Sequence, residues 1–238
     1  MNQNTIKRFL DNAKRYFMQQ EDLFGNTLHT EKKTNKKSLT KNLINSSGET
    51  WTTAPSLNDL YNEIHECTKC PLGYTRTNFV FGVGNPRAEV MFIGEAPGAD
   101  EDAQGEPFVG KAGQLLNKIL AAVHLDRNEV YICNILKCRP PNNRDPETSE
   151  METCAPYLYK QIELIKPKFI ICLGRIAGQW LLQTNQNLTA LRGKIHEYNG
   201  CSLIVTYHPA ALLRNPQWKH PTWEDMKMFK KAYDEMKA

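Results

Sequence analysis

The chain has 238 residues, of which 40% are hydrophobic and 24% are charged, and its formal net charge is +4. This length is enough to bury a full hydrophobic core and predicts one α/β domain of about 180 residues with an extension, rather than two large domains. No apolar run approaches the roughly 18 residues of a membrane-spanning helix, and the N-terminus lacks the apolar stretch of a secretion signal, so we expect a cytoplasmic protein without membrane contacts.

Residues 1–55 are interpreted as an N-terminal extension. Residues 4–20 (NTIKRFLDNAKRYFMQQ) place apolar side chains on one face, which predicts an amphipathic helix that needs a surface to pack on. Residues 30–55 are polar and rich in lysine, which is typical of a solvated linker. The extension carries nine Lys or Arg and five Asp or Glu, so residues 56–238 are close to neutral. We interpret the linker as a tether, with a nonspecific DNA-tracking arm as the alternative.

From Ser56, the expected N-cap of a helix that runs to about Glu66, the pattern alternates between helix and strand. Strands are expected at 88–93, 129–135, 168–173 and 201–206, and helices at about 111–124, 149–165, 174–183 and 220–236. Short apolar runs between helices predict a parallel sheet that is covered on both faces, here formed by residues 56–238. Ligands bind such sheets at the carboxyl ends of the strands, where Glu95, Asn134 and His208 would fall.

Residues 94–116, GEAPGADEDAQGEPFVGKAGQLL, are the most informative segment. They contain five glycines, two prolines and five acidic residues between an expected strand and a helix. Connections in α/β domains usually span a few residues, so this length is typical of a functional loop. The stretch from Gly105 to Lys111 is similar to the phosphate-binding pattern G-x-x-x-x-G-K-[ST]. However, Ala112 supplies no hydroxyl for magnesium and Pro107 removes a backbone donor, which argues against nucleotide hydrolysis.

The seven cysteines are too few for a disulfide scaffold. Three lie in or beside apolar strand-like runs, which is typical of small buried thiols. The other four lie in loops or at helix ends: Cys67 and Cys70 form a C-x2-C pair, and Cys138 and Cys154 follow. Four thiolates can hold a tetrahedral zinc ion or a cubane iron-sulfur cluster, and their spacing alone does not choose between them.

Five segments, CTKCPLG, GEAPGADEDAQGEPFVGKAGQLL, NILKCRPPNNRDP, LGRIA and HPAALLR, follow one another within residues 56–220. Together they resemble the family 4 uracil-DNA glycosylases, with the cysteine spacing of that family. The resemblance implies a three-layer α/β/α fold with a four-stranded parallel central sheet. It also implies a [4Fe-4S] cluster on Cys67, Cys70, Cys138 and Cys154, with zinc as the alternative occupant. We expect a structural role for the cluster, because hydrolysis of an N-glycosidic bond needs no electron.

The implied activity is excision of uracil from DNA in base excision repair, which leaves an abasic site and requires the base to leave the stack. By resemblance, Phe108 stacks on the flipped uracil. Asn134 reads the uracil edge, because an amide donates to O4 and accepts from N3–H at once. His208 faces O2, where negative charge develops. Glu95 orients or activates the water, with loop capping as its alternative role.

The same resemblance assigns further contacts. The backbone N–H groups of Ala96 and Gly98 would contact the uracil carbonyls, and Glu101 would lie near C5 and exclude the methyl group of thymine. A solvated loop charge is the alternative for Glu101. The expected DNA contacts are Lys111, Asn143 and Arg214 at phosphates, and Leu212 and Leu213 as wedges in the space left by the base. For the two leucines, burial of a short helix is the alternative.

The expected substrate is uracil-containing DNA, single- or double-stranded, bound by a monomer, with repair or replication proteins as further partners. Some relatives that trap DNA covalently carry a histidine in an inserted loop, whereas the corresponding KCRPPNNRDP has none, so we expect turnover. The alternatives are a non-catalytic iron-sulfur DNA-binding or polymerase-associated module and an electron-transfer protein. The presence of Glu95, Asn134 and His208 argues against a non-catalytic module.

Overall fold

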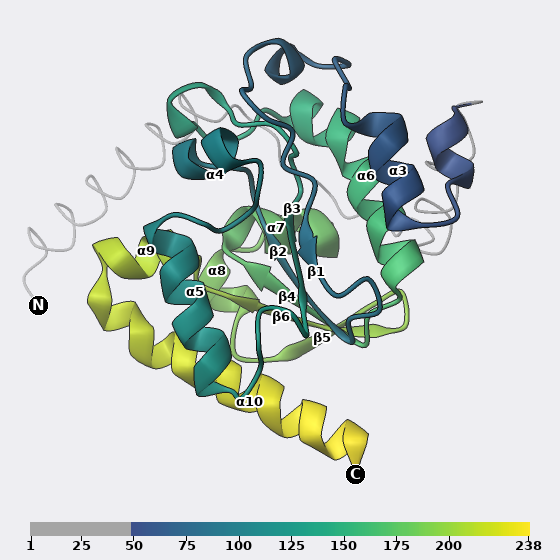
Figure 1. Cartoon of the computed structure of the whole chain (residues 1–238). Coiled ribbons are helices and arrows are strands. Elements are labelled where there is room, and N and C mark those ends of the chain that lie inside the picture. The colour runs from purple at the N-terminus through teal and green to yellow at the C-terminus, as the bar shows by residue number, and fades with distance from the viewer. Residues whose placement is uncertain (1–48) are drawn as a thin grey trace, which may run out of the picture. The chain divides into compact units, whose positions relative to one another are not determined.

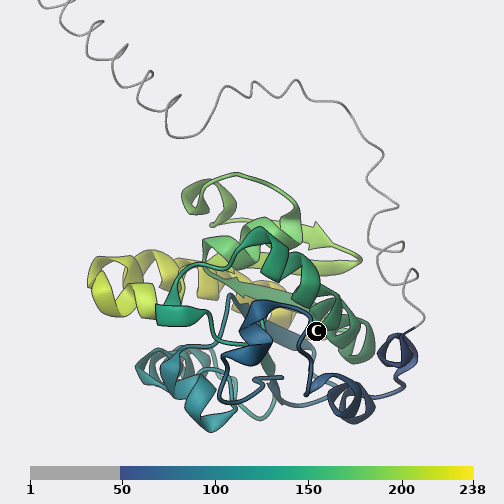
Figure 2. The ribbon, with the colours of Figure 1, turned by 90° about the horizontal axis from the view of Figure 1, so that it is seen from above.

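The computed structural model describes residues 49–238; the helix expected at residues 4–20 and the linker up to residue 48 lie outside this range. A central sheet is surrounded by helices (Figure 1, Figure 2). The strands are β1 (Val83–Gly84), β2 (Val90–Gly94), β3 (Tyr131–Asn134), β4 (Phe169–Leu173), β5 (Ile195–Tyr198) and β6 (Cys201–Thr206). The longer helices are α3 (Leu57–Ile64), α5 (Lys111–Ala122), α6 (Thr148–Ile165), α7 (Arg175–Leu182) and α10 (Lys219–Lys237). The shorter ones are α4 (Ala99–Gln104), α8 (Leu188–Leu191) and α9 (Pro209–Arg214), with 3-10 turns at Thr50–Thr53, Pro71–Tyr74, Pro141–Asn143 and Pro216–Trp218.

The sheet is mixed, with the strand order β1-β3-β2-β4-β6-β5. The four central strands pair in parallel, and β1 and β5 are antiparallel edge strands. The expectation of four strands is therefore wrong: the sheet has six, with a parallel set of four at its centre. The two edge strands escape sequence analysis for a physical reason. Strand β1 has two residues and β5 is mostly exposed, so neither presents an apolar run.

The turn between β5 and β6 carries the one sequence feature that would have revealed an edge strand. Asn199 and Gly200 have φ angles of 49° and 83°, and they connect the paired residues Tyr198 and Cys201. A two-residue turn with both φ angles positive favours the dipeptide Asn-Gly. The Asn-Gly dipeptide at residues 199 and 200 is therefore the sequence signal for this hairpin.

Two hydrophobic clusters cover the two faces of the sheet and confirm the three-layer α/β/α arrangement. Met91 and Ile93 of β2 pack with α6 and α7, while Val90 and Phe92 of the same strand pack with α5 and α10. All four side chains are buried, which explains why the central strands read as continuous apolar runs rather than alternating ones. Helix α10 runs along the outside of the domain (Figure 1).

A third cluster packs the start of the described chain against α6, and it includes the four cysteines of the predicted cluster. Trp51 is 6% exposed, and its ring lies edge-on to that of Tyr157 with centroids 4.9 Å apart. The packed part of the chain thus begins before Ser56, whose hydroxyl caps α3 by accepting from the N–H of Asp59. Between residues 49 and 238, no helix has the length and apolarity needed to cross a membrane.

Candidate active site

A hollow of about 350 Å³ opens where the carboxyl ends of β2, β3 and β6 meet. Its lining comes from the segment after β2, the start of α5, the end of β3, the loop before α6 and the start of α9. These residues are Glu95, Ala96, Pro97, Gly98, Glu101, Phe108, Ala112, Asn134, Pro140, Asn143, Arg144, Asp145, His208, Ala210 and Arg214. Residues predicted from distant parts of the sequence, among them Glu95, Asn134 and His208, therefore share one cavity at the strand ends.

Gly94 allows the aromatic wall and the amide of this cavity to approach β2. A Cβ atom at Gly94 would lie 2.3 Å from Asn134 Oδ1 and 2.7 Å from Phe108 Cζ. Phe108 itself has a positive φ of 54°, and a Cβ at Gly113 would lie 1.8 Å from its carbonyl oxygen. Glycine at positions 94 and 113 is thus required by close approach, and it fixes the ring of Phe108 in the pocket.

Asn134 presents an unpaired polar atom to the cavity. The residue is 2% exposed, and its Oδ1 has no hydrogen-bond partner among residues 49–238. A buried acceptor without a partner destabilises a protein by about 1–3 kcal/mol, so such atoms are retained where a ligand donates to them. Strand pairing places Asn134 directly beside Gly94 at the end of the sheet.

His208 is a neutral hydrogen-bond donor in this arrangement. Its Nδ1 accepts from the backbone N–H of Ala210 at 3.2 Å, so the ring proton is assigned to Nε2. Burial, with a smaller effect of the nearby Arg214 charge, lowers the pKa of His208 to about 4. The ring centroids of His208 and Phe108 are 5.4 Å apart. An imidazole that stays neutral at pH 7 can donate from Nε2 without carrying a charge into the cavity.

Glu95 titrates near neutral pH. Burial, and then repulsion from Asp145, raises the pKa of Glu95 to about 7, although Arg175 opposes this shift. Asp145 and Arg175 pair with each other at 3.5 Å on the exposed rim. A carboxyl group with this pKa is available both as a proton acceptor and as a donor at physiological pH, which is the property expected of a general base.

Glu101 binds three backbone N–H groups of its own loop, a structural role that the sequence does not indicate. Its carboxylate accepts from the backbone N–H groups of Gly98, Val109 and Gly110 at 3.0 to 3.1 Å. These bonds join residue 98 to residues 109 and 110, which are the two ends of the segment that contains α4 (residues 98–110, the α4 loop), beside the cavity. The neighbouring Asp102, 5% exposed, holds the other side of the loop by accepting from the N–H groups of Thr77 and Asn78. The thymine-excluding role of Glu101 stays a prediction.

The predicted DNA contacts are not all in the same environment. Asn143 and Arg214 line the cavity, whereas exposed Lys111 lies outside its lining. Leu213 is 46% exposed, but Leu212 is only 1% exposed and packs beside α5 and α10. Burial of a short helix therefore accounts for Leu212. For the exposed Leu213, the role of a wedge in the space left by the base stays a prediction.

The loop before α6 is held by an ion pair that the sequence motifs did not indicate. The guanidinium of Arg144 donates to both carboxylate oxygens of Glu150, at 2.9 and 2.6 Å, and Glu150 is 2% exposed. This contact lowers the pKa of Glu150. Glu147 and Glu150 form a capping box at the start of α6, and their spacing is the sequence feature that could have indicated a structural role for Glu150. The contact between Arg144 and Glu150 holds Arg144 and Asp145 at the cavity wall.

Comparison with known proteins decides the family. Residues 81–237 match the model of the uracil DNA glycosylase superfamily. The chain belongs to this superfamily. The Type-4 uracil-DNA glycosylase of Archaeoglobus fulgidus is 48% identical over 180 residues, which cover 72% of this chain and 90% of that protein. Those of Sulfurisphaera tokodaii and Saccharolobus solfataricus are 46% and 45% identical, over 72% and 74% of this chain and 82% and 86% of theirs. It is therefore a member of the type-4 branch.

In this type-4 family member, Cys67, Cys70, Cys138 and Cys154 lie in one hydrophobic cluster and form no disulfide bonds. Three of the sulfurs accept hydrogen bonds: Cys67 from the Tyr157 hydroxyl at 3.2 Å, Cys138 from an Arg76 guanidinium N–H at 3.3 Å, and Cys154 from the Lys137 backbone N–H at 3.3 Å. Burial raises the pKa of Cys138 to about 11 and that of Cys154 to about 12. Within the described range, no three His, Cys, Asp or Glu side chains are close enough to hold a single metal ion.

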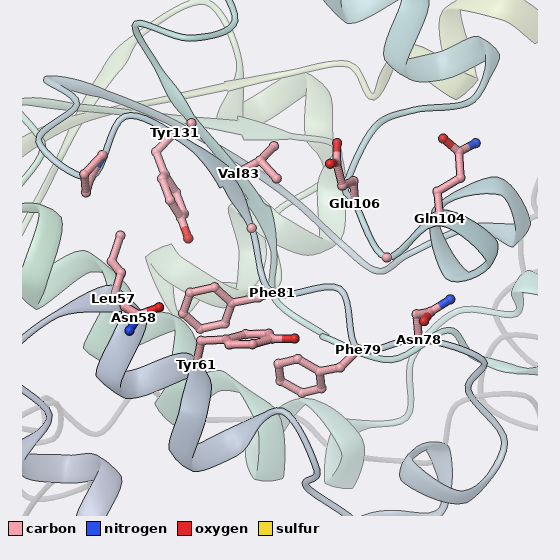
Figure 3. Close-up of a pocket in the computed structure, with 14 residues that line it drawn as sticks. Leu57, Asn58, Tyr61, Asn78, Phe79, Phe81, Val83, Gln104, Glu106 and Tyr131 are labelled. Atoms are coloured by element: carbon pink, nitrogen blue, oxygen red, sulfur yellow. The ribbon is translucent and has the colours of Figure 1, made fainter.

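A second hollow of about 690 Å³ lies between α3, β1 and the end of α4 (Figure 3). The aromatic side chains of Tyr61, Phe79, Phe81 and Tyr131 line it, and Glu106 is the one charged residue in its lining. No site residue predicted from the glycosylase resemblance belongs to this lining. The smaller hollow at the strand ends is therefore the candidate active site.

Proposed function

We propose that this chain is a uracil-DNA glycosylase that hydrolyses the N-glycosidic bond of a flipped uracil, releases the free base and leaves an abasic site. The observation that carries the proposal is the convergence of Glu95, Phe108, Asn134 and His208 on one cavity at the strand ends. Relatives named Type-4 uracil-DNA glycosylase at 44% to 48% identity support it.

Binding would use Phe108 and Asn134. The ring of Phe108 offers a stacking surface for a base that has left the duplex. The unpaired Oδ1 of Asn134 would accept from uracil N3–H while the amide nitrogen donates to O4. Cytosine has no hydrogen on N3 and an amino group at position 4, so with the amide in this orientation Oδ1 would face the N3 lone pair and the amide nitrogen would face the amino group. A site built for such bonds rejects the analogue that lacks them by about 10⁴ to 10⁵.

Bond cleavage would use His208 and Glu95. As the bond between C1′ and N1 breaks, its electron pair moves onto the uracil ring. The Nε2–H of His208 would donate to uracil O2, and removal of one such donor typically costs about 3–4 kcal/mol of transition-state stabilisation. The carboxylate form of Glu95 would orient the water, take its proton as oxygen bonds to C1′ and offset the positive charge of the sugar.

The cysteine cluster suits a [4Fe-4S] group. Four cysteines from two distant segments lie in one hydrophobic cluster, and hydrogen bonds to three of the sulfurs oppose the effect of burial and stabilise the thiolate form. Both a zinc ion and a [4Fe-4S] cluster accept four cysteine ligands, and the resemblance to the family 4 uracil-DNA glycosylases implies the iron-sulfur cluster, with zinc as the alternative. Such a cluster would link the residues around Cys67 to the loop that follows Cys138, and the uracil chemistry itself would not pass through it.

The deciding experiment is incubation of the purified full-length chain, with its iron, with a uracil-containing oligonucleotide, followed by alkaline cleavage. Strand scission at the uracil position supports the proposal, and an intact strand supports the alternative of a non-catalytic DNA-binding or polymerase-associated module. Single- and double-stranded substrates are compared in the same assay. A monomeric, cytoplasmic enzyme with repair or replication partners stays a prediction from the sequence.

A further inference from the structure

Lys137 is a buried lysine that the proposed chemistry does not use. Its side chain is 0% exposed, and its ammonium donates to the backbone oxygen of Asn134 at 2.8 Å and to Gln161 Oε1 at 2.6 Å. None of the ion pairs found between residues 49 and 238 includes Lys137. Lysine is rarely fully buried, and here its hydrogen bonds go to two neutral oxygens, with the cysteines at 133, 138 and 154 as its electrostatic neighbours.

Gln161 extends the contact into a network. It is 0% exposed on α6, and its Nε2 donates to the backbone oxygen of Phe81 at 3.0 Å and to the Tyr131 hydroxyl at 3.3 Å. Tyr131 begins β3, the strand that ends at Asn134, and its ring lines the second hollow (Figure 3). The network therefore ties both ends of β3 to helix α6.

The backbone of Lys137 is fixed independently of its side chain. Its N–H donates to Cys154 Sγ at 3.3 Å, and its carbonyl accepts from the N–H of Val80 at 2.8 Å. The side chain then reaches back three residues and closes the turn after β3 onto Asn134. The direction of the Asn134 side chain depends on its backbone, and its Oδ1 is the unpaired acceptor of the base pocket.

We propose that Lys137 and Gln161 are positioning residues for Asn134: they hold the end of β3 so that the Asn134 amide meets the uracil edge. This inference rests on the proposed glycosylase function. Displacements of about 1 Å in a reacting site cost up to about a hundredfold in rate. We therefore expect Lys137→Met to lower the single-turnover rate of uracil release on the order of tenfold to a hundredfold, with DNA binding within about threefold of the wild type.

The control is Lys160→Met. Lys160 is also buried on α6, at 5% exposure and next to Gln161, but its ammonium pairs with Glu163 at 3.0 Å. Its loss should leave the single-turnover rate within about twofold of the wild type, since it removes a buried cation without touching Asn134. Iron content and the visible absorbance of the cluster are measured for every variant. A rate loss in Lys137→Met that merely follows iron loss overturns the proposal.

A double-mutant cycle with Asn134→Ala separates positioning from general support. If Lys137 acts through Asn134, Lys137→Met changes the rate by less than about twofold once Asn134 is alanine. An equal fold-loss in both backgrounds overturns the inference. Gln161→Met keeps the Lys137 ammonium and removes its contact with Gln161. The same double-mutant cycle with Asn134→Ala is measured for this variant, so the inference can still be tested if Lys137→Met does not fold.

Binding of free uracil, measured by calorimetry, supplies a readout that does not depend on turnover. Weaker uracil binding by Lys137→Met than by Lys160→Met is expected, and equal binding overturns the inference. If the wild type releases no uracil from DNA, the glycosylase proposal fails. In that outcome the comparison of uracil binding still decides whether Lys137 positions Asn134.

Discussion

The side-chain oxygen of Asn134 lies 2.3 Å from the point that a Cβ atom on Gly94 would occupy. The same Cβ would lie 2.7 Å from Phe108 Cζ. Two strands and the α4 loop thus meet at one glycine, and the smallest possible addition there would move both the amide and the ring. Gly94 has no positive φ, so its requirement is one of space and not of backbone conformation.

Gly94→Ala is therefore expected to lower the rate of uracil release on the order of a hundredfold while the protein still folds. Gly178→Ala is the matched control, because its Cβ would press on the side chain of Val205 at 2.7 Å but does not line the cavity. Overpacking should destabilise this control by about 1–3 kcal/mol with its rate retained. Rates and thermal melting are measured for both variants, and an active Gly94→Ala would show that Asn134 and Phe108 are not held as we infer.

His208→Ala is expected to lower the single-turnover rate by about 10² to 10³, the usual effect of removing one donor to developing charge. Because the pKa of His208 is held at about 4, its donor form is present throughout neutral pH. The rate should therefore not fall as the pH rises through the ordinary histidine value of about 6.5. A fall there that disappears in His208→Ala would mean that His208 acts in its protonated form.

Glu95 gives the pH profile its expected shape. The active form is the carboxylate, and the pKa of Glu95 is raised to about 7, so single-turnover excision should rise with pH through about 7 and level off above it. Glu95→Gln should remove most of the rate and the pH step together. A pH-independent wild-type rate between pH 6 and 8, with its chemistry shown to be rate-limiting, would remove Glu95 from the role of base.

The same raised pKa has a consequence for stability. Ionisation of Glu95 is disfavoured in the folded state, so its destabilising effect is absent below the unfolded pKa of about 4.5 and complete above about 7. Glu95→Gln should therefore melt a few degrees above the wild type at pH 8, and the two melting temperatures should converge near pH 4.5. Melting curves of both proteins across this range check the sign, and a wild type that is the more stable at pH 8 would contradict it.

The sequence predicted the centre of the fold and the meeting of Glu95, Asn134 and His208 because both follow from one rule. Continuous apolar strands between helices form a parallel sheet, and the residues after those strands share an edge. Buried polar contacts do not follow such a rule. Glu101 resembles a solvated acid in a glycine-rich loop, and Lys137 resembles a surface lysine beside a cysteine. Their roles depend on which backbone groups lie within reach in three dimensions.

Glu101→Gln separates two roles. The observed bonds to the N–H groups of Val109 and Gly110 predict a looser α4 loop, with slower uracil release and faster proteolysis between residues 98 and 110. Exclusion of the thymine methyl group predicts instead that thymine release appears. Glu106→Gln removes a charge from the same loop outside the active-site lining and serves as the control. Thymine and uracil release from matched oligonucleotides decides between the two roles.

Loss of a cysteine ligand should disturb the loop that lines the active site and lower uracil excision. Cys138 precedes the loop whose residues Asn143, Arg144 and Asp145 line the cavity. Cys70→Ser is expected to lower the iron content, increase proteolysis between residues 139 and 147 and reduce excision. Cys201→Ala is the control, since it also removes a thiol, but one that lies on β6 outside the cluster of four. The structural role predicts that excision falls together with the protection of residues 139–147. An iron-free Cys70→Ser protein that keeps both would show that the cluster does not hold this loop.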